Sequence, residues 1–322
     1  MNGLTSLALA AAATLIAGHA LAQNYPTKQV RVIIPYSVGG GADAATRLVT
    51  DHLSRALGQT FVVDARPGGN TLIGAEAAAR APADGYTLFV TGGSTMSIQP
   101  FVFQGKLPYD PLGDFAPVSM VSRFPFFLVV PSTLGVGSFA ELLAHIKANP
   151  GKLSYASNGT GSIGHLGTEI IRQATGMDLT HVPYKGFGPV LPDLLAGRIA
   201  LVMMDLAPLG SNANSGAVKI IASTSAQRSP FMPNVPTVAE LAIPGYEIDV
   251  WFALYAPAKT PAPVVSLLNA ELRKLLTSAE GKAAFVRLGH ESMHSTPEYV
   301  TSRIVSEQAR FGPAVKALNL KP

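Results

Sequence analysis

Short apolar runs alternate with segments of helical periodicity in the first third of the chain. Apolar runs of strand length cover residues 30–34, 61–63 and 85–90. Between them, apolar positions recur at helical spacing from Ala45 to Ala56, and residues 73–80 favour a short helix. The order strand, helix, strand, helix, strand over residues 28–95 predicts a parallel sheet with right-handed crossovers.

A second unit with the same alternation starts near residue 126. The apolar runs that predict its strands are residues 126–130, 152–156, 179–182, 199–204 and 218–222. Helices are predicted to begin at Ser138 and Ile163 and to cover residues 189–195, and Ser138 and Glu141 have the spacing of a capping box. This unit is therefore also of the α/β class.

The last part of the chain is interpreted as a return to the first unit. Residues 237–240 cap a short helix, residues 251–257 form an apolar strand, and two helices begin at Pro261 and Thr296. The simplest packing makes residues 23–125 with 247–322 one lobe (lobe 1) and residues 126–246 the other (lobe 2), so the chain crosses between lobes twice. Ligands of open α/β sheets bind at the carboxyl ends of strands, and two facing lobes would place two such ends across one cleft.

Residues 1–22 are interpreted as a secretory signal peptide and not as part of the fold. An apolar run from Leu4 to Ala17 is followed by Ala20-Leu21-Ala22, a small-x-small cleavage pattern, although no Lys or Arg lies near Met1. The run is shorter than the roughly 20 apolar residues that span a bilayer. We expect cleavage after Ala22 and a protein of the periplasm. The alternative is a buried N-terminal helix.

Composition narrows the classes of partner. The formal charge of +4 comes from 24 basic and 20 acidic side chains, and only 14% of residues are charged. No run of Lys and Arg marks a nucleic-acid surface, so we expect no nucleic-acid partner. The chain has no cysteine, which excludes disulfides, thiolate metal sites and a lipidated N-terminal cysteine. A mild positive field favours small anions, but the charge alone decides nothing.

The loop after the first predicted strand, residues 35–43, has three consecutive glycines before a helix. Glycine lets the backbone approach a ligand closely, and the helix N-terminus offers unpaired N–H groups at the positive end of its dipole. The loop therefore predicts an anion site that needs no basic side chain. Asp43 is expected to be the N-cap of the helix. The alternative is a flexible turn without a ligand.

A second loop, residues 157–165, also joins a predicted strand to a predicted helix. It has the spacing GxGxxG from Gly159 to Gly164. A dinucleotide site would require an acidic residue at the end of the next strand, but that strand ends with Val182, Pro183 and Tyr184. The hydroxyl, amide and backbone N–H groups of this loop favour an oxyanion pocket instead.

Two further segments follow predicted strands. Residues 91–95, a Thr-Gly-Gly-Ser-Thr segment, lie beside the first loop if the sheet is parallel, and would then add hydroxyl donors. A plain loop fits equally well. Asp205 follows the strand 201–204 and would orient a water or a ligand hydroxyl, or else cap a helix or bond within its own loop.

Motifs of common enzyme classes are absent from the sequence, which has no Walker P-loop, no GxSxG and no HExxH. His290 and His294 are four residues apart and could share a helix face, but two histidines without a carboxylate are a weak metal signal. A hydrolase using Ser162 and His165 is the enzymatic alternative, although spacing reveals no acidic partner. We therefore predict no catalytic residue, no metal and no cofactor.

Many segments occur in an order and at a spacing that resemble one known family. They are Tyr25-Pro26-Thr27-Lys28, Pro35 to Asp43, Arg66-Pro67-Gly68-Gly69, Asp84 to Leu88, Leu107 to Pro111, Asp114 to Val118, Ser157 to Leu166, His181 to Gly186, Pro233 to Glu240, Trp251-Phe252 and Ala256-Pro257. Nearly the whole chain after residue 22 is thus similar to the Bug-type periplasmic solute-binding proteins, the extracytoplasmic receptors of tripartite tricarboxylate transporters.

The resemblance implies an α/β, type II periplasmic-binding-protein fold with two lobes, a central cleft, a hinge crossed twice and no catalysis. It also implies a small carboxylate ligand, which backbone N–H groups and waters hold at the first glycine loop, with the Ser/Asn/Gly loop and Asp205 added from lobe 2. Here Ser37 stands where the family usually has proline. The predicted ligand-binding residues are Tyr36, Ser37, Gly39, Gly40, Gly41, Ala42, Asp43, Thr91, Gly92, Ser94, Ser157, Asn158, Gly159, Thr160, Gly161, Ser162, His165, Tyr184 and Asp205.

Our hypothesis is that two helix N-termini, one per lobe, bind the two ends of a dicarboxylate. Tyr36, Trp251 and Phe252 would form walls that admit an aromatic diacid such as terephthalate, unless these rings belong to the core. The protein is expected to act as a monomer and to deliver its ligand to membrane transporter subunits. The alternative partner is a signalling kinase to which the ligand-bound protein acts as a sensor.

Overall fold

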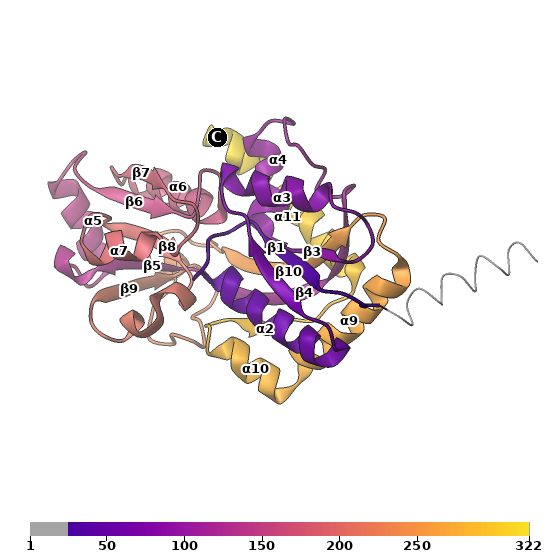
Figure 1. Cartoon of the computed structure of the whole chain (residues 1–322). Helices are drawn as coiled ribbons and strands as arrows, with labels where there is room; N and C mark the ends of the chain where they lie inside the picture. The colour runs from indigo at the N-terminus through magenta and orange to yellow at the C-terminus, as the bar shows by residue number, and fades with distance from the viewer. Residues whose placement is uncertain (1–24, 322) are drawn as a thin grey trace, which may run out of the picture.

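The computed structural model describes residues 25–321 and has two lobes side by side (Figure 1). Lobe 1 is built on a six-stranded sheet in the order β11 (Glu291–Ser292), β4 (Phe115–Pro125), β10 (Asp249–Pro257), β3 (Thr87–Gly92), β1 (Val30–Ile34) and β2 (Phe61–Ala65). Lobe 2 is built on a five-stranded sheet in the order β7 (Thr180–Pro183), β6 (Ser154–Ser157), β8 (Leu201–Met204), β5 (Phe127–Pro131) and β9 (Val218–Ser223). The predicted signal peptide lies outside the described residues.

Helices pack on both sheets. Those of lobe 1 are α2 (Gly41–Leu57), α3 (Leu72–Ala79), α4 (Gln99–Val102), α9 (Ala262–Thr277), α10 (Ala279–Val286) and α11 (Pro297–Ala317). Those that follow in lobe 2 are α5 (Phe139–Ala148), α6 (Ile163–Thr175), α7 (Val190–Leu195) and α8 (Val238–Leu241). Within residues 25–321, no helix combines the length and the apolar character needed to span a bilayer.

The predicted parallel unit of lobe 1 is confirmed. Strand β1 pairs in parallel with β2 on one side and with β3 on the other, so that Val30 lies opposite Phe61 and Arg31 opposite Thr87. Parallel strands end at the same edge of a sheet, and the loops that follow β1 and β3 therefore lie next to each other. In lobe 2, β6 and β8 are also parallel, which places the loop after Ser157 beside Asp205.

Strand β4 is the longest element that the sequence pattern did not predict. It contains Pro117 and Pro125, and a proline within a run argues against a central strand because it cannot donate to the ladder. The structure accommodates Pro117 because β4 pairs with β10 along its whole length, whereas on its other side β11 contacts only Ser122 and Arg123. Helix α10, strand β11 and the π-helical turn Ser94–Ile98 were also not predicted.

The chain passes between the two sheets at Phe126 and again between Ser223 and Asp249. Thr224 joins these crossings. Its backbone N–H donates to the Phe126 carbonyl (2.9 Å), its Oγ1 accepts from the Phe126 N–H (2.9 Å), and its carbonyl accepts from the Ile248 N–H (2.8 Å). The Thr224 hydroxyl also donates to the Ile248 carbonyl (2.9 Å). One fully buried threonine therefore holds both connections together.

Candidate ligand-binding site

A cavity that is partly open to solvent lies between the two lobes, at the strand ends of both sheets. Lobe 1 contributes Tyr36, Ser37, Gly40, Gly41, Ala42, Gly92, Gly93, Ser94, Phe124, Val250, Trp251 and Phe252 to its lining. The first crossing and lobe 2 contribute Phe126, Asn158, Ile163, Gly186, Phe187 and Asp205. The wall is mostly apolar, and no lysine or arginine among residues 25–321 lines it.

The N-terminus of α2 opens onto this cavity. Gly40 is the N-cap residue, and no side chain within the described range caps the first turn. The predicted capping role of Asp43 is wrong, because the helix begins at Gly41 and Asp43 lies inside its first turn. From there its Oδ2 accepts from the Gly39 N–H (3.1 Å), and its Oδ1 pairs with Arg47 (3.0 Å). The first-turn amides of α2 therefore remain available to an anion.

Asp205 faces this helix from the opposite lobe. This residue is 2% exposed, and a methyl group added at Gly41 would lie 1.9 Å from Asp205 Oδ2. His290 of lobe 1 is fully buried, with Nε2 at 3.5 Å from the same oxygen, Nδ1 at 3.3 Å from Ser122 Oγ and its ring stacked on Phe124. The two lobes thus meet at an acidic side chain, a glycine and a histidine.

Aromatic side chains form the wall beside α2. Tyr36 contacts Phe252 with ring centroids 5.9 Å apart, and Phe252 contacts Phe124 at 5.2 Å. The hydroxyl of Tyr36 lies 3.3 Å from Thr91 Oγ1, and burial raises the pKa of this tyrosine, so the phenol stays neutral. Trp251 is held by a hydrogen bond of 2.7 Å from its indole N–H to Glu307. The wall is therefore fixed by contacts on its far side.

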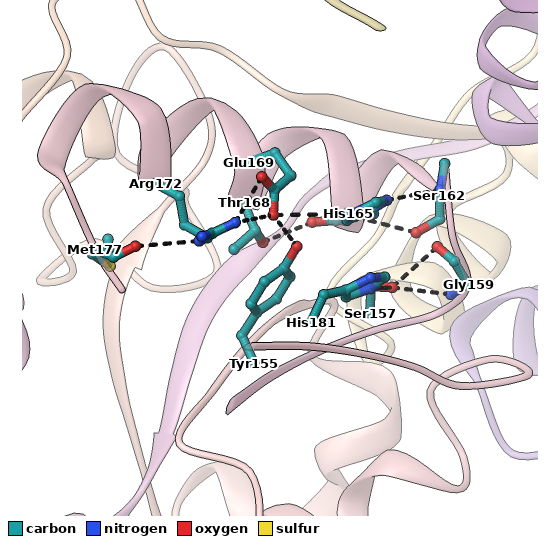
Figure 2. Close-up of polar contacts among 12 residues, drawn as sticks. Tyr155, Ser157, Gly159, Ser162, His165, Thr168, Glu169, Arg172, Met177 and His181 are labelled. Carbon is teal, nitrogen blue, oxygen red and sulfur yellow. Dashed lines mark hydrogen bonds and ion pairs between the residues drawn. The ribbon is translucent and has the colours of Figure 1, made fainter. Parts of the chain in front are cut away.

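The serine and glycine loop after β6 turns its polar groups inward on lobe 2 (Figure 2). Ser162 is the N-cap of α6 and accepts from the His165 N–H (3.2 Å). Ser157 Oγ accepts from the Gly159 N–H (3.2 Å) and lies 2.7 Å from His181 Nε2. The Gly161 N–H donates to His165 Nδ1 (2.9 Å). These groups stabilise the loop, which leaves few of them for a ligand.

Two histidines stack behind this loop. The rings of His165 and His181 lie 3.9 Å apart and nearly parallel, with Tyr155 beside them (Figure 2). Burial lowers the pKa of His165 to about 4. Burial, together with the neighbouring His165, lowers the pKa of His181 to about 4 as well. Both rings are therefore neutral at pH 7, and their hydrogen bonds hold the loop in place.

Direct contacts close the cavity at its edges. The Ile163 N–H, at the first position of α6, donates to Ser94 Oγ of lobe 1 (3.0 Å). A methyl group added at Gly186 would lie 2.4 Å from Ser37 Oγ, so only glycine fits there between the lobes. The amide of α6 closest to lobe 1 is thus already paired.

The structure separates the predicted ligand-binding residues into two sets. Those that line the cavity are Tyr36, Ser37, Gly40, Gly41, Ala42, Gly92, Ser94, Asn158 and Asp205. Those outside its lining are Gly39, Asp43, Thr91, Ser157, Gly159, Thr160, Gly161, Ser162, His165 and Tyr184. Of this second set, Tyr184 donates its hydroxyl to Asp193 (2.6 Å), and the others mainly support the two loops.

Several lining residues were not among the predicted set. Trp251 and Phe252 had been considered only as possible walls, and the others are Gly93, Phe124, Phe126, Ile163, Gly186, Phe187 and Val250. Phe124 and Phe126 lie at the boundary between the predicted lobes, which is the one signal that could have found them. Gly186 follows β7, the third strand of lobe 2 along the chain, by three residues.

The residue pairs considered for metal binding and for hydrolysis are not arranged as those two alternatives require. His290 and His294 do not share a helix, because β11 separates them, and His294 bonds to Asn269 (3.1 Å). Within residues 25–321, no three His, Cys, Asp or Glu side chains form a metal-binding group. The hydrogen bond between Ser162 and His165 uses the histidine backbone, whereas its ring accepts from Gly161, so a nucleophile and base are not paired.

Comparison with known proteins gives a consistent result. Residues 45–320 match the family described as tripartite tricarboxylate transporter family receptor. The chain is 35% identical to the protein BugT of Bordetella pertussis, over 95% of this chain and 94% of BugT.

Solved structures agree with this match. Rpa4515 of R. palustris with adipate has a TM-score of 0.89 at 35% identity and covers 92% of this chain and 99% of its own. MatC of Rhodopseudomonas palustris with bound malate has a TM-score of 0.83 at 26% identity and covers 90% and 100%. The predicted two-lobed α/β periplasmic-binding-protein fold is confirmed by these similarities.

Proposed function

The chain belongs to the tripartite tricarboxylate transporter receptor family, and from this premise we propose that it captures a small organic carboxylate in the periplasm and delivers it to a membrane transporter. The protein changes no bond in its ligand. Closure of the lobes removes the carboxylate from water, which strengthens each charge-assisted hydrogen bond to it.

One observation supports this function above the others. The uncapped N-terminus of α2 opens into a mostly apolar cavity between the lobes. Backbone N–H groups and the helix dipole favour a carboxylate there without a lysine or arginine. An apolar wall beside an anion site suits an organic acid better than an inorganic anion.

The sequence-based hypothesis and the ligands of two relatives both support a diacid as a candidate ligand. Two structurally similar proteins hold adipate and malate, and the rings of Tyr36, Trp251 and Phe252 suit an aromatic acid such as terephthalate. The structure weakens one argument for a dicarboxylate, however, namely that each lobe offers a helix N-terminus to one of the two carboxylates. The helix of lobe 2 that would bind the second carboxylate has its first amide paired with Ser94.

A thermal-shift screen of adipate, malate and terephthalate tests the function. A ligand at 100 times its dissociation constant should stabilise the protein by about 2.7 kcal/mol. Adipamide, which has the length of adipate without its charge, is the matched control and should give no shift. If none of these acids and no other small carboxylate gives a larger shift than its neutral amide, the proposed function is wrong.

A further inference from the structure

Asp205 is a buried carboxylate that lines the cavity. The residue is 2% exposed, and neither side-chain oxygen has a hydrogen-bond partner within residues 25–321. A carboxylate in such a place is costly unless it accepts hydrogen bonds. The group therefore points to a donor that enters the cavity.

The protein itself does not supply this donor. No lysine or arginine of the described chain lines the cavity, and the closest candidate, His290 Nε2, is 3.5 Å from Asp205 Oδ2 and is itself counted among the buried atoms without a partner. On the lobe 1 side, Asp205 Oδ2 also faces Gly41, which has no side chain to donate a hydrogen bond. A ligand hydroxyl or ammonium group would satisfy Asp205.

The position of Asp205 fixes where that donor lies on the ligand. Asp205 Oδ2 is close enough to Gly41 that a methyl group there would be 1.9 Å away, so the carboxylate lies directly beside the first turn of α2. A ligand carboxylate bound to the α2 amides and a donor bound to Asp205 would therefore lie close together, and adjacent carbon atoms of one ligand satisfy this arrangement.

A second carboxylate in this place would be unfavourable. It would contact Asp205, a like charge, without the α2 amides that compensate the first carboxylate, in a site with no cationic side chain from the described residues. The Ser37 hydroxyl, which is buried and unpartnered, can pair with the first carboxylate beside α2. The rest of the ligand faces the rings of Phe124, Phe187 and Trp251.

The geometry points to a 2-hydroxy or 2-amino carboxylate with an apolar remainder as the ligand of this protein. This assignment rests on the proposed function and narrows it. The carboxylate binds the first turn of α2, the donor on the neighbouring carbon binds Asp205, and the apolar part fills the aromatic side of the cavity.

Four compounds that differ only at carbon 2 test the assignment by calorimetry. They are 3-phenylpropanoate (hydrogen), 3-phenyllactate (hydroxyl), phenylalanine (ammonium) and benzylmalonate (carboxylate). We expect the hydroxyl or the ammonium compound to bind about tenfold more tightly than 3-phenylpropanoate, and benzylmalonate to bind most weakly. A parallel series of butanoate, 2-hydroxybutanoate, 2-aminobutanoate and ethylmalonate covers the case of a ring too large for the cavity.

The variant Asp205→Asn links the preference to this residue, because it keeps the shape of the side chain and removes its charge. In the variant, the advantage of the donor should fall to about threefold or less, and the malonate should gain about tenfold relative to the other compounds. If the variant does not fold, the order of affinities in the wild type decides alone.

The results separate this assignment from the proposed function. If adipate or terephthalate binds while both series fail, or if the malonates bind the wild type as tightly as the hydroxy acids, the function stands and the assignment is overturned. An unchanged order of affinities in Asp205→Asn also overturns it. If no carboxylate binds at all, the proposed function fails, and this assignment fails with it.

Discussion

At the scale of single residues, the absence of a side chain at Gly41 is what allows the lobes to meet. Asp205 Oδ2 and His290 Nε2 lie 1.9 Å and 3.1 Å from the position that a methyl group at Gly41 would occupy. A side chain here would separate the acidic residue of lobe 2 from the helix of lobe 1. Gly41 therefore belongs both to the proposed anion site and to the contact between the lobes.

Gly41→Ala should reduce the affinity for a carboxylate by about tenfold or more, because Asp205 or the whole lobe must move away. The ligand-free protein should lose little stability, since alanine is favoured over glycine in a helix by up to about 1 kcal/mol. Calorimetry and thermal unfolding measure the two effects.

Gly40→Ala is the comparison for this variant. Its added methyl group would have Ser37 O as its nearest neighbour, at 3.8 Å, and its φ of −91° suits alanine. We expect a loss several times smaller than for Gly41→Ala. Equal losses would show that the contact with Asp205 is not the cause.

The stacked histidines of lobe 2 make stability depend on pH. Burial lowers the pKa of His165 and His181 to about 4, below the ordinary value of about 6.5 in the unfolded chain. Between these two values the unfolded state binds more protons than the folded state, so stability is full above pH 6.5 and falls as the pH drops toward 4. The loss should reach about 1–3 kcal/mol.

The variant His181→Asn tests this dependence through urea unfolding at pH 7 and pH 5. It removes one of the two groups, so the difference in unfolding free energy between the two pH values should shrink by roughly half. His145→Asn, at a position outside the stacked pair, serves as the control and should behave like the wild type. A slope that is the same in all three proteins would contradict the proposed cause.

At the scale of elements, the helix N-termini of the two lobes have different roles. Helix α2 begins at a glycine and leaves its first turn open, whereas α6 begins at Ser162, whose hydroxyl caps it. The backbone N–H of Ile163, the first residue of α6, also pairs with Ser94 across the cleft. We infer that α2 binds the anion and that α6 mainly fixes the position of lobe 2.

Ser162→Ala should therefore act as the loss of a helix cap and lower the unfolding free energy by about 1 kcal/mol. Ser138→Ala is the matched variant, because Ser138 caps α5 in the same way, accepts from Glu141 and lies outside the cavity lining. Both should lose similar stability, as measured by urea unfolding. A loss of affinity of about tenfold in Ser162→Ala alone would show instead that its hydroxyl binds the ligand.

The elements also show what the sequence could predict. Strands β1, β2 and β3 and their glycine loops follow from local periodicity and spacing, and the adjacency of two loops follows from parallel pairing. Strand β4 could not be predicted, because Pro117 and Pro125 interrupt its apolar pattern in the sequence. Its stability comes from pairing with β10, which is distant in sequence.

The hydrogen-bond partners of individual polar groups also could not be predicted from the sequence. Ser157 bonds to His181, 24 residues later, only because β6 and β7 pair in a particular register. The pairing of Ile163 with Ser94 depends on how the lobes meet. The sequence located the loops that surround the site, and tertiary contacts decided which of their groups face the cavity.

At the scale of the whole molecule, two chain crossings connect the lobes, and Thr224 bonds to both of them. Its hydroxyl accepts from Phe126 in the first crossing and donates to Ile248 in the second. Because the threonine is fully buried, these bonds are shielded from water. Any rotation of one lobe against the other must therefore involve both crossings together.

Thr224→Val removes the hydroxyl at nearly constant volume and leaves the Phe126 N–H without its partner. We expect a loss of about 1–3 kcal/mol in unfolding free energy, measured by urea denaturation. Thr224→Ser keeps the hydroxyl and should lose clearly less. If serine and valine were equally destabilising, packing of the methyl group and not the hydrogen bonds would hold the crossings.

Phe126 belongs both to the first crossing and to the lining of the cavity. A compound bound beside this ring therefore contacts a residue of the crossing itself. Compounds that share the same polar end but differ in width should therefore stabilise different angles between the two lobes. Under the proposed function, an oversized compound would then be retained without being released to the transporter, and would block uptake.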